Sequence, residues 1–442
     1  MQKEIQLFYP FRINERLNYI CTHLLTEVLG VTVSITDSRS DFLNYPGPAI
    51  NYSGEDMSHG LWIHPHGLLE ETTIRPQQTE VSQWKGFPCF FLQNEGDIPF
   101  DIFAASFYLL SRYEEYAAQG MDEHGRFDPI ESLAYKHNFL ETPIVDRWAY
   151  LLKNELLQKY PGMEFPLRRF RMISTFDVDH PYQFKKRGIV RTFGALGKDT
   201  LRLDFRQVGE RMAVQLRLKS DPYMKAIRWI AQWHQTTGKE YFLFILRGAQ
   251  GKYGVSTSFF LSSYYQYLKE LKSATIGLHP SYETYKNLEL LIKEKQELEE
   301  ILGRKVITSR HHFLRISIPE TYQELAIAGI EDDFSLAYAK MPGFRSGTAI
   351  PHRFYDLEQE KATGLLLHPT VMMDTTFIAH QKLLPEDALG KIKSLIDECY
   401  QSGGDYVSLW HNSNLAGNST DNPWIDVFIE SFKYASALEK NS

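Results

Sequence analysis

Cysteine is scarce in this sequence, and its arrangement excludes two kinds of site. The 442 residues contain three cysteines, Cys21, Cys89 and Cys399, which stand far apart and are odd in number. They show neither the spacing of a metal site nor the framework of a disulfide-rich domain. The sequence therefore favours a protein of a reducing compartment.

Long apolar runs and long basic runs are also missing. No stretch has the length of a membrane span, and the first residues lack the apolar segment of a signal peptide. Together with the cysteine pattern, this predicts a cytoplasmic protein with no membrane span. The net charge of −7, without a basic cluster, argues against nucleic acid as a partner.

The composition is typical of a globular protein, because hydrophobic residues make up 43% of the chain and charged residues 23%. A length of 442 residues exceeds one ordinary core, so we expect two domains. The turn at Tyr160-Pro161-Gly162 ends a helical pattern. We therefore place the two domains at 1–165 and 166–442.

The first 165 residues predict a smaller mixed α/β domain. Helices are predicted at 99–119 and 145–159 from their apolar spacing and end signals. The Asp, His and Arg residues at 122–128 are interpreted as a polar surface loop held by ion pairs. Apolar runs of strand length occupy 5–9, 31–35 and 87–92.

The second half alternates strand patterns with helix patterns. One helix pattern, at 283–302, carries a stripe of Leu and Ile under charged positions. Such alternation predicts parallel βα units, and hence a barrel or an open sheet. Strands are predicted at 170–176, 240–246, 275–278, 306–309, 334–337, 365–367 and 406–409.

A pair of aspartates follows the first of these strands. Asp177 and Asp179 are two residues apart, so on an extended backbone they point to the same side. Two carboxylates at such a short distance either share a cation or perturb each other's pKa. The alternative is that Asp179-His180-Pro181 only turns the chain at the end of a strand.

Histidine or arginine follows five further predicted strands. Because the carboxyl ends of parallel strands meet at one face, we expect these side chains to share one site. They are His279, followed by Glu283, then Arg310, His311 and His312, then Arg345, then His368, and finally His411 next to Trp410.

These residue types suit metal-assisted hydrolysis of an amide or ester. Asp179, His279 and a third ligand would form the N/O site that zinc and its neighbours accept, with a position left for water. Asp177 would be the general base, held ionised by Arg310. His411 would protonate the leaving group.

Three further residues are expected to face the substrate or an oxyanion. Backbone N–H groups near Phe313 would stabilise the oxyanion, and Trp410 stands beside the expected acid. Arg345 is expected either to contact an anionic group of the substrate or to hold a loop by structural pairing.

With these motifs, the second half resembles the polysaccharide deacetylases, a carbohydrate esterase family with a distorted (β/α) barrel. Ser-Thr-Phe-Asp-Val-Asp at 174–179 is similar to the family's first motif, and Ile-Gly-Leu-His-Pro at 276–280 to its second. Arg310 with Phe313 is similar to the third motif, and Leu-Trp-His-Asn at 409–412 to the fifth. Asp374 is a candidate for the fourth.

The resemblance implies the same roles as the residue chemistry, with one departure. The family's second motif supplies another His four residues after the first, and this chain has Glu283 there. We expect His312 to be the third metal ligand instead, with Glu283 as the fallback.

The fold expected from these patterns and the resemblance is α/β: a C-terminal distorted (β/α) barrel of about seven strands after a smaller mixed α/β domain. Segments 101–105, 110–115 and 125–127 of the first half resemble an uncharacterised N-terminal domain that precedes such barrels in bacterial proteins.

The function expected is that of a metal-dependent hydrolase, with zinc as the divalent ion. It would remove an acetyl group from an N- or O-acetylated carbohydrate in polysaccharide metabolism. Two alternatives stay open. One is a hydrolase of a non-sugar amide on the same barrel, and the other is a non-catalytic barrel that binds sugar.

Overall fold

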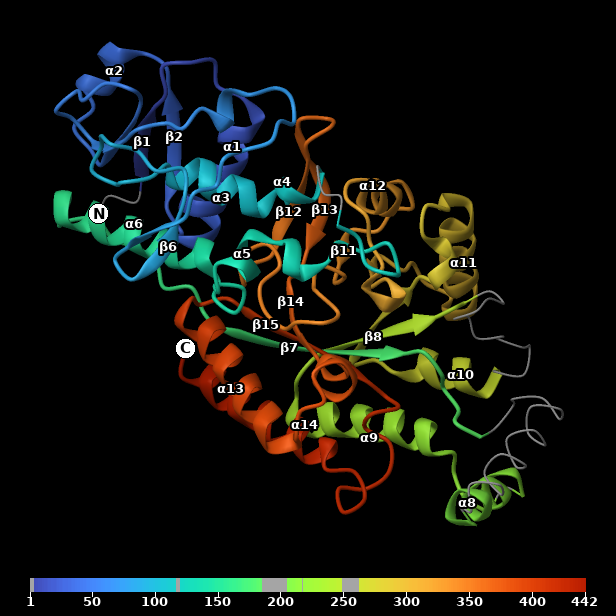
Figure 1. The fold of residues 1–442 in the computed structure, drawn as a ribbon. Helices are drawn as coiled ribbons and strands as arrows, with labels where there is room; N and C mark the ends of the chain where they lie inside the picture. The colour runs from blue at the N-terminus through green and yellow to red at the C-terminus, as the bar shows by residue number, and fades with distance from the viewer. Residues whose placement is uncertain (1–3, 117–119, 185–204, 217, 249–261) are drawn as a thin grey trace.

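The computed structural model describes residues 4–116, 120–184, 205–216, 218–248 and 262–442. Within these ranges the chain forms a smaller N-terminal α/β region and a larger region built on a curled sheet (Figure 1). The predicted α/β class is confirmed, and so is the smaller mixed region that precedes the larger sheet.

The N-terminal region is built on a four-stranded parallel sheet of order β2-β1-β3-β4. Its strands are β1 (Glu4–Phe8), β2 (Thr32–Thr36), β3 (Ala49–Tyr52) and β4 (Leu61–Ile63), and β5 (Ser82–Trp84) pairs with β6 (Phe87–Cys89) as a separate hairpin. The helices are α1 (Glu15–Cys21), continued by the π-helix η1 (Thr22–Val28), then α2 (Arg39–Leu43), α3 (Ile102–Leu110), α4 (Tyr113–Tyr116), α5 (Leu133–Lys136) and α6 (Ile144–Lys159).

The helix predicted at 99–119 is wrong as one continuous element, whereas the second predicted helix is confirmed as α6. Helix α3 begins after Asp101, whose Oδ1 accepts a hydrogen bond from the Ala104 N–H at 2.9 Å. It is broken at Arg112, which has a left-handed backbone (φ 55°) and directs its guanidinium to Glu115 at 2.8 Å. Residues 117–119 lie outside the described residues.

The larger sheet has nine strands rather than about seven, in the order β12-β13-β11-β10-β9-β8-β7-β15-β14. All neighbours are parallel except β12 and β13. The strands are β7 (Arg171–Val178), β8 (Tyr241–Leu246), β9 (Ala274–His279), β10 (Thr308–Ser309), β11 (Asp332–Asp333), β12 (His352–Asp356), β13 (Lys361–Leu367), β14 (Thr370–Met373) and β15 (Asp405–His411).

The strand predicted at 334–337 is wrong, because the paired residues are the two aspartates before it. Asp333 is fully buried, and its carboxylate accepts hydrogen bonds from the hydroxyls of Ser309 (2.7 Å) and Ser335 (2.9 Å). Two acidic residues form a strand here because tertiary partners satisfy them.

The sheet is curled into a half-barrel. Strands β13 and β14 are separated by two residues in the chain but lie near opposite ends of the sheet order, so the two edges must approach each other. The segment between β11 and β12 bridges them: Gly343 N–H donates to Val371 O (2.8 Å), and Thr370 N–H to Leu336 O (3.1 Å).

Helices cover the outer face of this sheet (Figure 1). Apolar side chains from the strands, such as Phe176 and Trp410, pack there against Phe428. These helices are α9 (Pro222–Thr237), α10 (Ser262–Glu270), α11 (Leu288–Leu302), α12 (Glu320–Ile327), α13 (Pro385–Gln401) and α14 (Trp424–Lys440). Helix α8 (Phe205–Gln215) lies apart from the sheet (Figure 1). Among the described helices, none is long and apolar enough to cross a bilayer.

The two regions share part of one hydrophobic core. The hairpin of β12 and β13 extends to the N-terminal helices (Figure 1), where Tyr355 and Leu357 join the N-terminal core. Tyr19 donates a hydrogen bond to the Arg353 carbonyl at 2.9 Å, and Arg16 forms an ion pair with Glu360 at 2.5 Å. These contacts hold the N-terminal region against the half-barrel.

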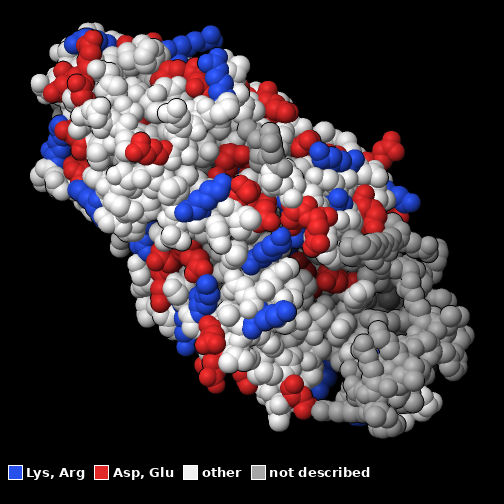
Figure 2. All heavy atoms as spheres, in the orientation of Figure 1, with Lys and Arg blue, Asp and Glu red and all other residues white. Residues whose placement is uncertain are grey.

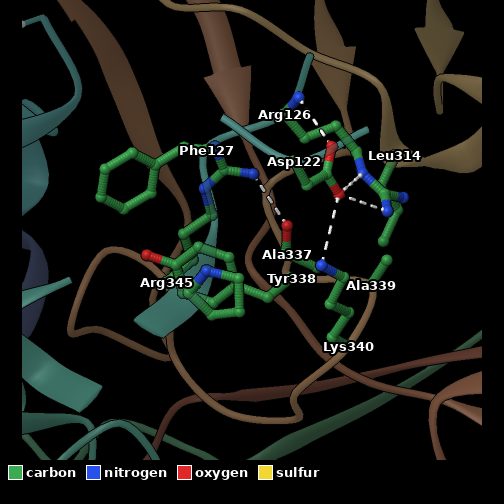
Figure 3. Close-up of a pocket in the computed structure, with 10 residues that line it drawn as sticks. Asp122, Arg126, Phe127, Leu314, Ala337, Tyr338, Ala339, Lys340 and Arg345 are labelled. Atoms are coloured by element: carbon green, nitrogen blue, oxygen red, sulfur yellow. Dashed lines mark hydrogen bonds and ion pairs between the residues drawn. The ribbon is translucent and has the colours of Figure 1, made fainter. Parts of the chain in front are cut away.

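A pocket lies where residues 122–129 meet the barrel segment 337–345 (Figure 3). It is lined by Asp122, Arg126, Phe127, Pro129, Leu314, Ala337, Tyr338, Ala339, Lys340 and Arg345. On the molecular face shown in Figure 2, acidic and basic side chains are interspersed rather than gathered by sign.

Candidate metal and active site

Two neighbouring strands place a carboxylate and an imidazole side by side. Strands β7 and β15 run parallel, and Asp177 pairs with His411 while Phe176 pairs with Trp410. Paired residues point to the same face of a sheet, and successive residues alternate between faces. Since Phe176 and Trp410 pack under the helices, Asp177 and His411 lie on the inner face of the half-barrel.

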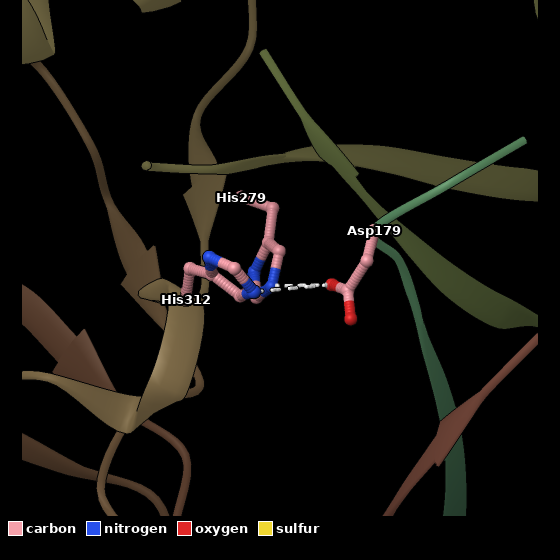
Figure 4. Close-up of side chains that lie close together, drawn as sticks. All are labelled: Asp179, His279 and His312. Carbon is pink, nitrogen blue, oxygen red and sulfur yellow. Dashed lines mark ion pairs between the residues drawn. The ribbon is translucent and has the colours of Figure 1, made fainter. Parts of the chain in front are cut away.

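Beyond these strand ends, three side chains form a compact group (Figure 4). His279 Nε2, at the end of β9, lies 3.2 Å from Asp179 Oδ1. His312 Nε2, on the short helix η6 (His312–Leu314) after β10, lies 3.7 Å from the same oxygen. One ligand atom of each lies within 4.8 Å of the other two, and in the described part of the chain this is the one group of three His, Cys or acidic residues that could hold a metal ion.

The group fits a divalent cation of the zinc type. Asp179 Oδ1 and His279 Nε2 are buried and make no hydrogen bond to any described residue. His279 Nδ1 donates to the Arg310 carbonyl at 2.5 Å, which fixes the tautomer and leaves the Nε2 lone pair for a ligand. Two nitrogens and one oxygen are a donor set that zinc accepts while keeping a position for water.

Protonation in the group follows from its packing. Burial raises the Asp179 pKa, but the nearby imidazoles of His279, His312 and His411 outweigh burial and lower it. Burial lowers the His312 pKa to about 3, so this imidazole is neutral at pH 7. Burial also lowers the His279 pKa, but Asp177 and Asp179 raise it overall. A cation would take the place of that proton.

Arg310 holds Asp177 in position from inside the barrel. Its fully buried guanidinium donates from Nη1 to Asp177 Oδ1 (3.0 Å) and Thr175 Oγ1 (2.6 Å). It also donates from Nη2 to Thr370 Oγ1 (3.1 Å) and from Nε to the Phe334 carbonyl (3.0 Å). With four acceptors, this guanidinium is fixed in place and holds one oxygen of the Asp177 carboxylate through a charge-assisted hydrogen bond.

Asp374 holds His411 in the same way. Its Oδ1 lies 2.6 Å from His411 Nδ1, and its Oδ2 accepts from the His411 N–H (2.7 Å) and from Asn414 Nδ2 (3.0 Å). Burial disfavours the imidazolium, but Asp374, together with Asp179 and Asp177, raises the His411 pKa to about 10. His411 is therefore protonated at neutral pH and able to act as an acid.

The backbone next to His312 is strained. Phe313 (φ 64°) and Leu314 (φ 50°) are consecutive left-handed residues, a conformation that costs non-glycine residues on the order of 1–3 kcal/mol each. The Phe313 ring packs edge-on to His312, with ring centres 4.6 Å apart. The Phe313 carbonyl accepts a hydrogen bond from Arg126 Nη1 at 2.5 Å.

Several residues expected at the site lie elsewhere. His368 Nε2 lies 2.7 Å from Asp332 Oδ1, and its ring stacks on Phe334. Arg345 is buried and forms a bidentate ion pair with Glu115, at 2.9 and 2.5 Å, so structural pairing is the observed outcome for it. Trp410 faces the outer core, and Glu283 is not part of the metal-ligand group. The structure thus brings together Asp177, Asp179, His279, Arg310, His312 and His411.

The residues that sequence reasoning missed are mostly partners of these six. Thr175 and Thr370 bind Arg310, and both stand in or next to the strand-end motifs, which was the available signal. The interpretation of 122–128 as a surface loop is wrong, because the side chains of Asp122 and Arg126 are only 4% and 8% exposed. Their ion pair does exist, at 2.7 Å.

One family model matches part of the chain. Residues 6–161 match the model of a family of unknown function, DUF7033. No curated protein sequence matches the chain.

Solved structures resemble about three fifths of the chain at low identity. A protein assigned as a polysaccharide deacetylase from Mycobacterium smegmatis is 14% identical, with 61% of this chain and 85% of that chain covered and a TM-score of 0.40. The polysaccharide deacetylase of Bacillus cereus is 10% identical (60% and 88% covered, TM-score 0.29). The 4-alpha-glucanotransferase of Thermococcus litoralis is 11% identical (62% and 38% covered, TM-score 0.33). Likeness of this degree assigns no activity.

Proposed function

We propose that the protein is a metal-dependent hydrolase that removes an acetyl group from an N- or O-acetylated carbohydrate, with zinc as the metal. One observation carries the proposal: Asp177, in contact with Arg310, and a protonated His411 lie on paired strands beside the Asp179, His279 and His312 group. A base, an acid and a metal site in one place are what amide or ester hydrolysis requires.

The roles of the residues follow from their contacts. When bound by Asp179, His279 and His312, the cation supplies Lewis acidity and lowers the pKa of water. Asp177, held in position by Arg310, accepts the proton of the attacking water. His411, protonated and oriented by Asp374, donates its proton to the departing nitrogen or oxygen.

The substrate class rests on the sequence motifs. Four of them, at 174–179, 276–280, 310–313 and 409–412, are similar in order and spacing to those of the polysaccharide deacetylases. We also propose that residues 1–165 and 166–442 are the two domains of the chain, joined through the shared core described above.

Acetate release tests the function. The purified protein, stripped of metal and reloaded with zinc or cobalt, is assayed on N-acetylated and O-acetylated sugars. We expect acetate release that depends on the metal and is lost in Asp177→Asn. Ammonia from a cyclic ureide with no acetate from sugars would identify the amide hydrolase instead. Metal bound without turnover of either class would favour a sugar-binding barrel, and a chain that binds no metal would overturn the proposal.

A further inference from the structure

A tight turn of the N-terminal region contacts Phe313, the residue after His312. Residues 121–127 form it: Met121 and Phe127 pair as an isolated antiparallel bridge, and the Asp122 N–H donates to the Arg126 carbonyl at 2.8 Å. Asp122 Oδ1 accepts from the N–H groups of His124 (2.9 Å) and Arg126 (3.0 Å). This side-chain cap makes the turn stiff.

The turn positions the Arg126 side chain so that it contacts the strained peptide at Phe313. Arg126 donates from Nε and Nη2 to Asp122 Oδ2, at 2.9 and 2.7 Å, which fixes the plane of the guanidinium. Its Nη1 then donates to the Phe313 carbonyl at 2.5 Å. Asp122, Arg126 and Lys340 lie close together at the pocket (Figure 3), and Lys340 Nζ adds a second cation 4.0 Å from Asp122 Oδ2.

Neighbouring contacts hold the turn against the same two barrel loops. Arg315 Nε, just after the strained residues, donates to the His124 carbonyl at 2.7 Å. The Tyr285 hydroxyl, in the loop after β9, donates to the Gly125 carbonyl at 3.2 Å. The turn is therefore attached to the loop that follows His279 and to the loop that contains His312.

We infer that Arg126 is a positioning residue of the metal site. Phe313 and Leu314 are left-handed without being glycine, so the peptide after His312 keeps this shape only while its surroundings hold it. Arg126 supplies a charge-assisted hydrogen bond to that peptide from outside the barrel. The N-terminal region thereby sets the direction of the His312 imidazole. This inference rests on the metal site of the proposed function.

Substrate binding is a poorer explanation of Arg126. Its side chain is 8% exposed, and Nε, Nη1 and Nη2 each already donate to a protein oxygen. A residue placed in this way acts through the Phe313 peptide rather than on a ligand.

Two measurements on the full chain test the inference. The first is hydrogen exchange of the amides at 311–316 in the metal-free protein. The second is zinc affinity by competition with a chelator. In Arg126→Met we expect faster exchange confined to this segment and zinc binding weakened about 10- to 100-fold, the usual effect of losing a partner that orients a ligand. Arg126→Lys keeps the charge and one donor, so an intermediate loss is expected.

Arg147→Met is the matched control. Arg147 also joins the two regions, through Glu398 at 2.7 Å, but on helix α6 rather than beside the metal-ligand group. It is expected to leave both measurements unchanged. If Arg126→Met does not fold, Asp122→Asn replaces it, because the amide oxygen still caps the turn while the ion pair that aims Arg126 is lost.

The outcomes separate this inference from the proposed function. Wild-type protein that binds zinc without releasing acetate would contradict the function, and the Arg126 variants would still be decisive. Unchanged exchange at 311–316, or unchanged zinc affinity in Arg126→Met, would overturn the inference. An equal change of exchange and zinc affinity in Arg147→Met would also overturn the inference, since weaker contact between the two regions would then explain both results.

Discussion

The N-terminal sheet is parallel and the half-barrel is parallel except for β12 and β13, and both have acidic side chains near the carboxyl ends of their strands. In the N-terminal sheet, Asp101 accepts hydrogen bonds from the Tyr52 hydroxyl (2.7 Å) and from the N–H groups of His66 (2.7 Å) and Ala104 (2.9 Å). In the half-barrel, Asp179 Oδ1 faces two imidazoles and accepts no hydrogen bond from the described residues.

The difference separates a carboxylate that stabilises a fold from one available for a ligand. Asp101 uses its oxygens to cap helix α3 and to join it to β3, so little capacity remains for a ligand. Asp179 is left with an open lone pair in a buried place, which costs stability unless a cation or proton occupies it. An acidic residue at a strand end therefore indicates a ligand site only when its hydrogen-bond partners are known.

The largest effect should come from His279→Ala. Because the ligand set shrinks to two residues, we expect loss of the tightly bound metal and of all metal-dependent activity. Metal content per chain after dialysis measures it. His66→Ala, the matched imidazole of the N-terminal sheet, should keep its metal, and a full equivalent of metal in His279→Ala would remove His279 from the site.

Asp177→Asn should separate chemistry from metal binding. The amide keeps the shape of the side chain but cannot accept a proton, so kcat should fall by roughly 10²- to 10⁴-fold while metal content stays unchanged. Steady-state kinetics and metal analysis measure the two effects. Asp101→Asn makes the same change in the other sheet, and a comparable loss of kcat there would contradict the comparison.

Asp374→Asn should move the alkaline limb of the pH profile. Asp374 is a main cause of the raised His411 pKa, which is about 10, so its loss should lower that pKa by roughly 1–3 units. Activity that requires protonated His411 would then be lost at lower pH. The raised His411 pKa also contributes to the free energy of unfolding. This contribution is present in full below the ordinary histidine pKa of about 6.5 and is lost as pH rises through about 10. Titration of the imidazole by NMR in both proteins measures the shift, and an unchanged pKa would refute it.

The smallest effect should come from Tyr52→Phe in the N-terminal sheet. The change leaves the buried Asp101 carboxylate without its hydroxyl donor, and we expect about 1–3 kcal/mol lower unfolding free energy. Urea unfolding measures this loss, with kcat and metal content expected to stay at wild-type values. Tyr9→Phe, whose partner Glu70 is partly exposed, should cost less. A loss of activity in Tyr52→Phe would mean that the two sheets are coupled more tightly than their contacts indicate.

Local patterns predicted most of the larger sheet but not its edges. Strands β7, β8, β9 and β15 are predicted because their segments are rich in apolar residues, as buried parallel strands are. Strand β14 was missed since it directly follows the turn at His368-Pro369, and β12 because charged residues interrupt it. Their strand state depends on pairing with distant segments rather than on their own sequence.

By itself the sequence determined the α/β class and the carboxyl-end edge where Asp177, His279, Arg310 and His411 gather. This was possible because the local sequence determines which face of a strand each residue occupies and where the strand ends. The sequence favours His312 over Glu283 as the third ligand, but only the tertiary structure brings His312, and not Glu283, together with Asp179 and His279. The same holds for the pairing of Arg345 with Glu115 and for the contact of Arg126 with Phe313, 187 positions away. Such contacts depend on how separate loops pack, and spacing along the chain does not encode that.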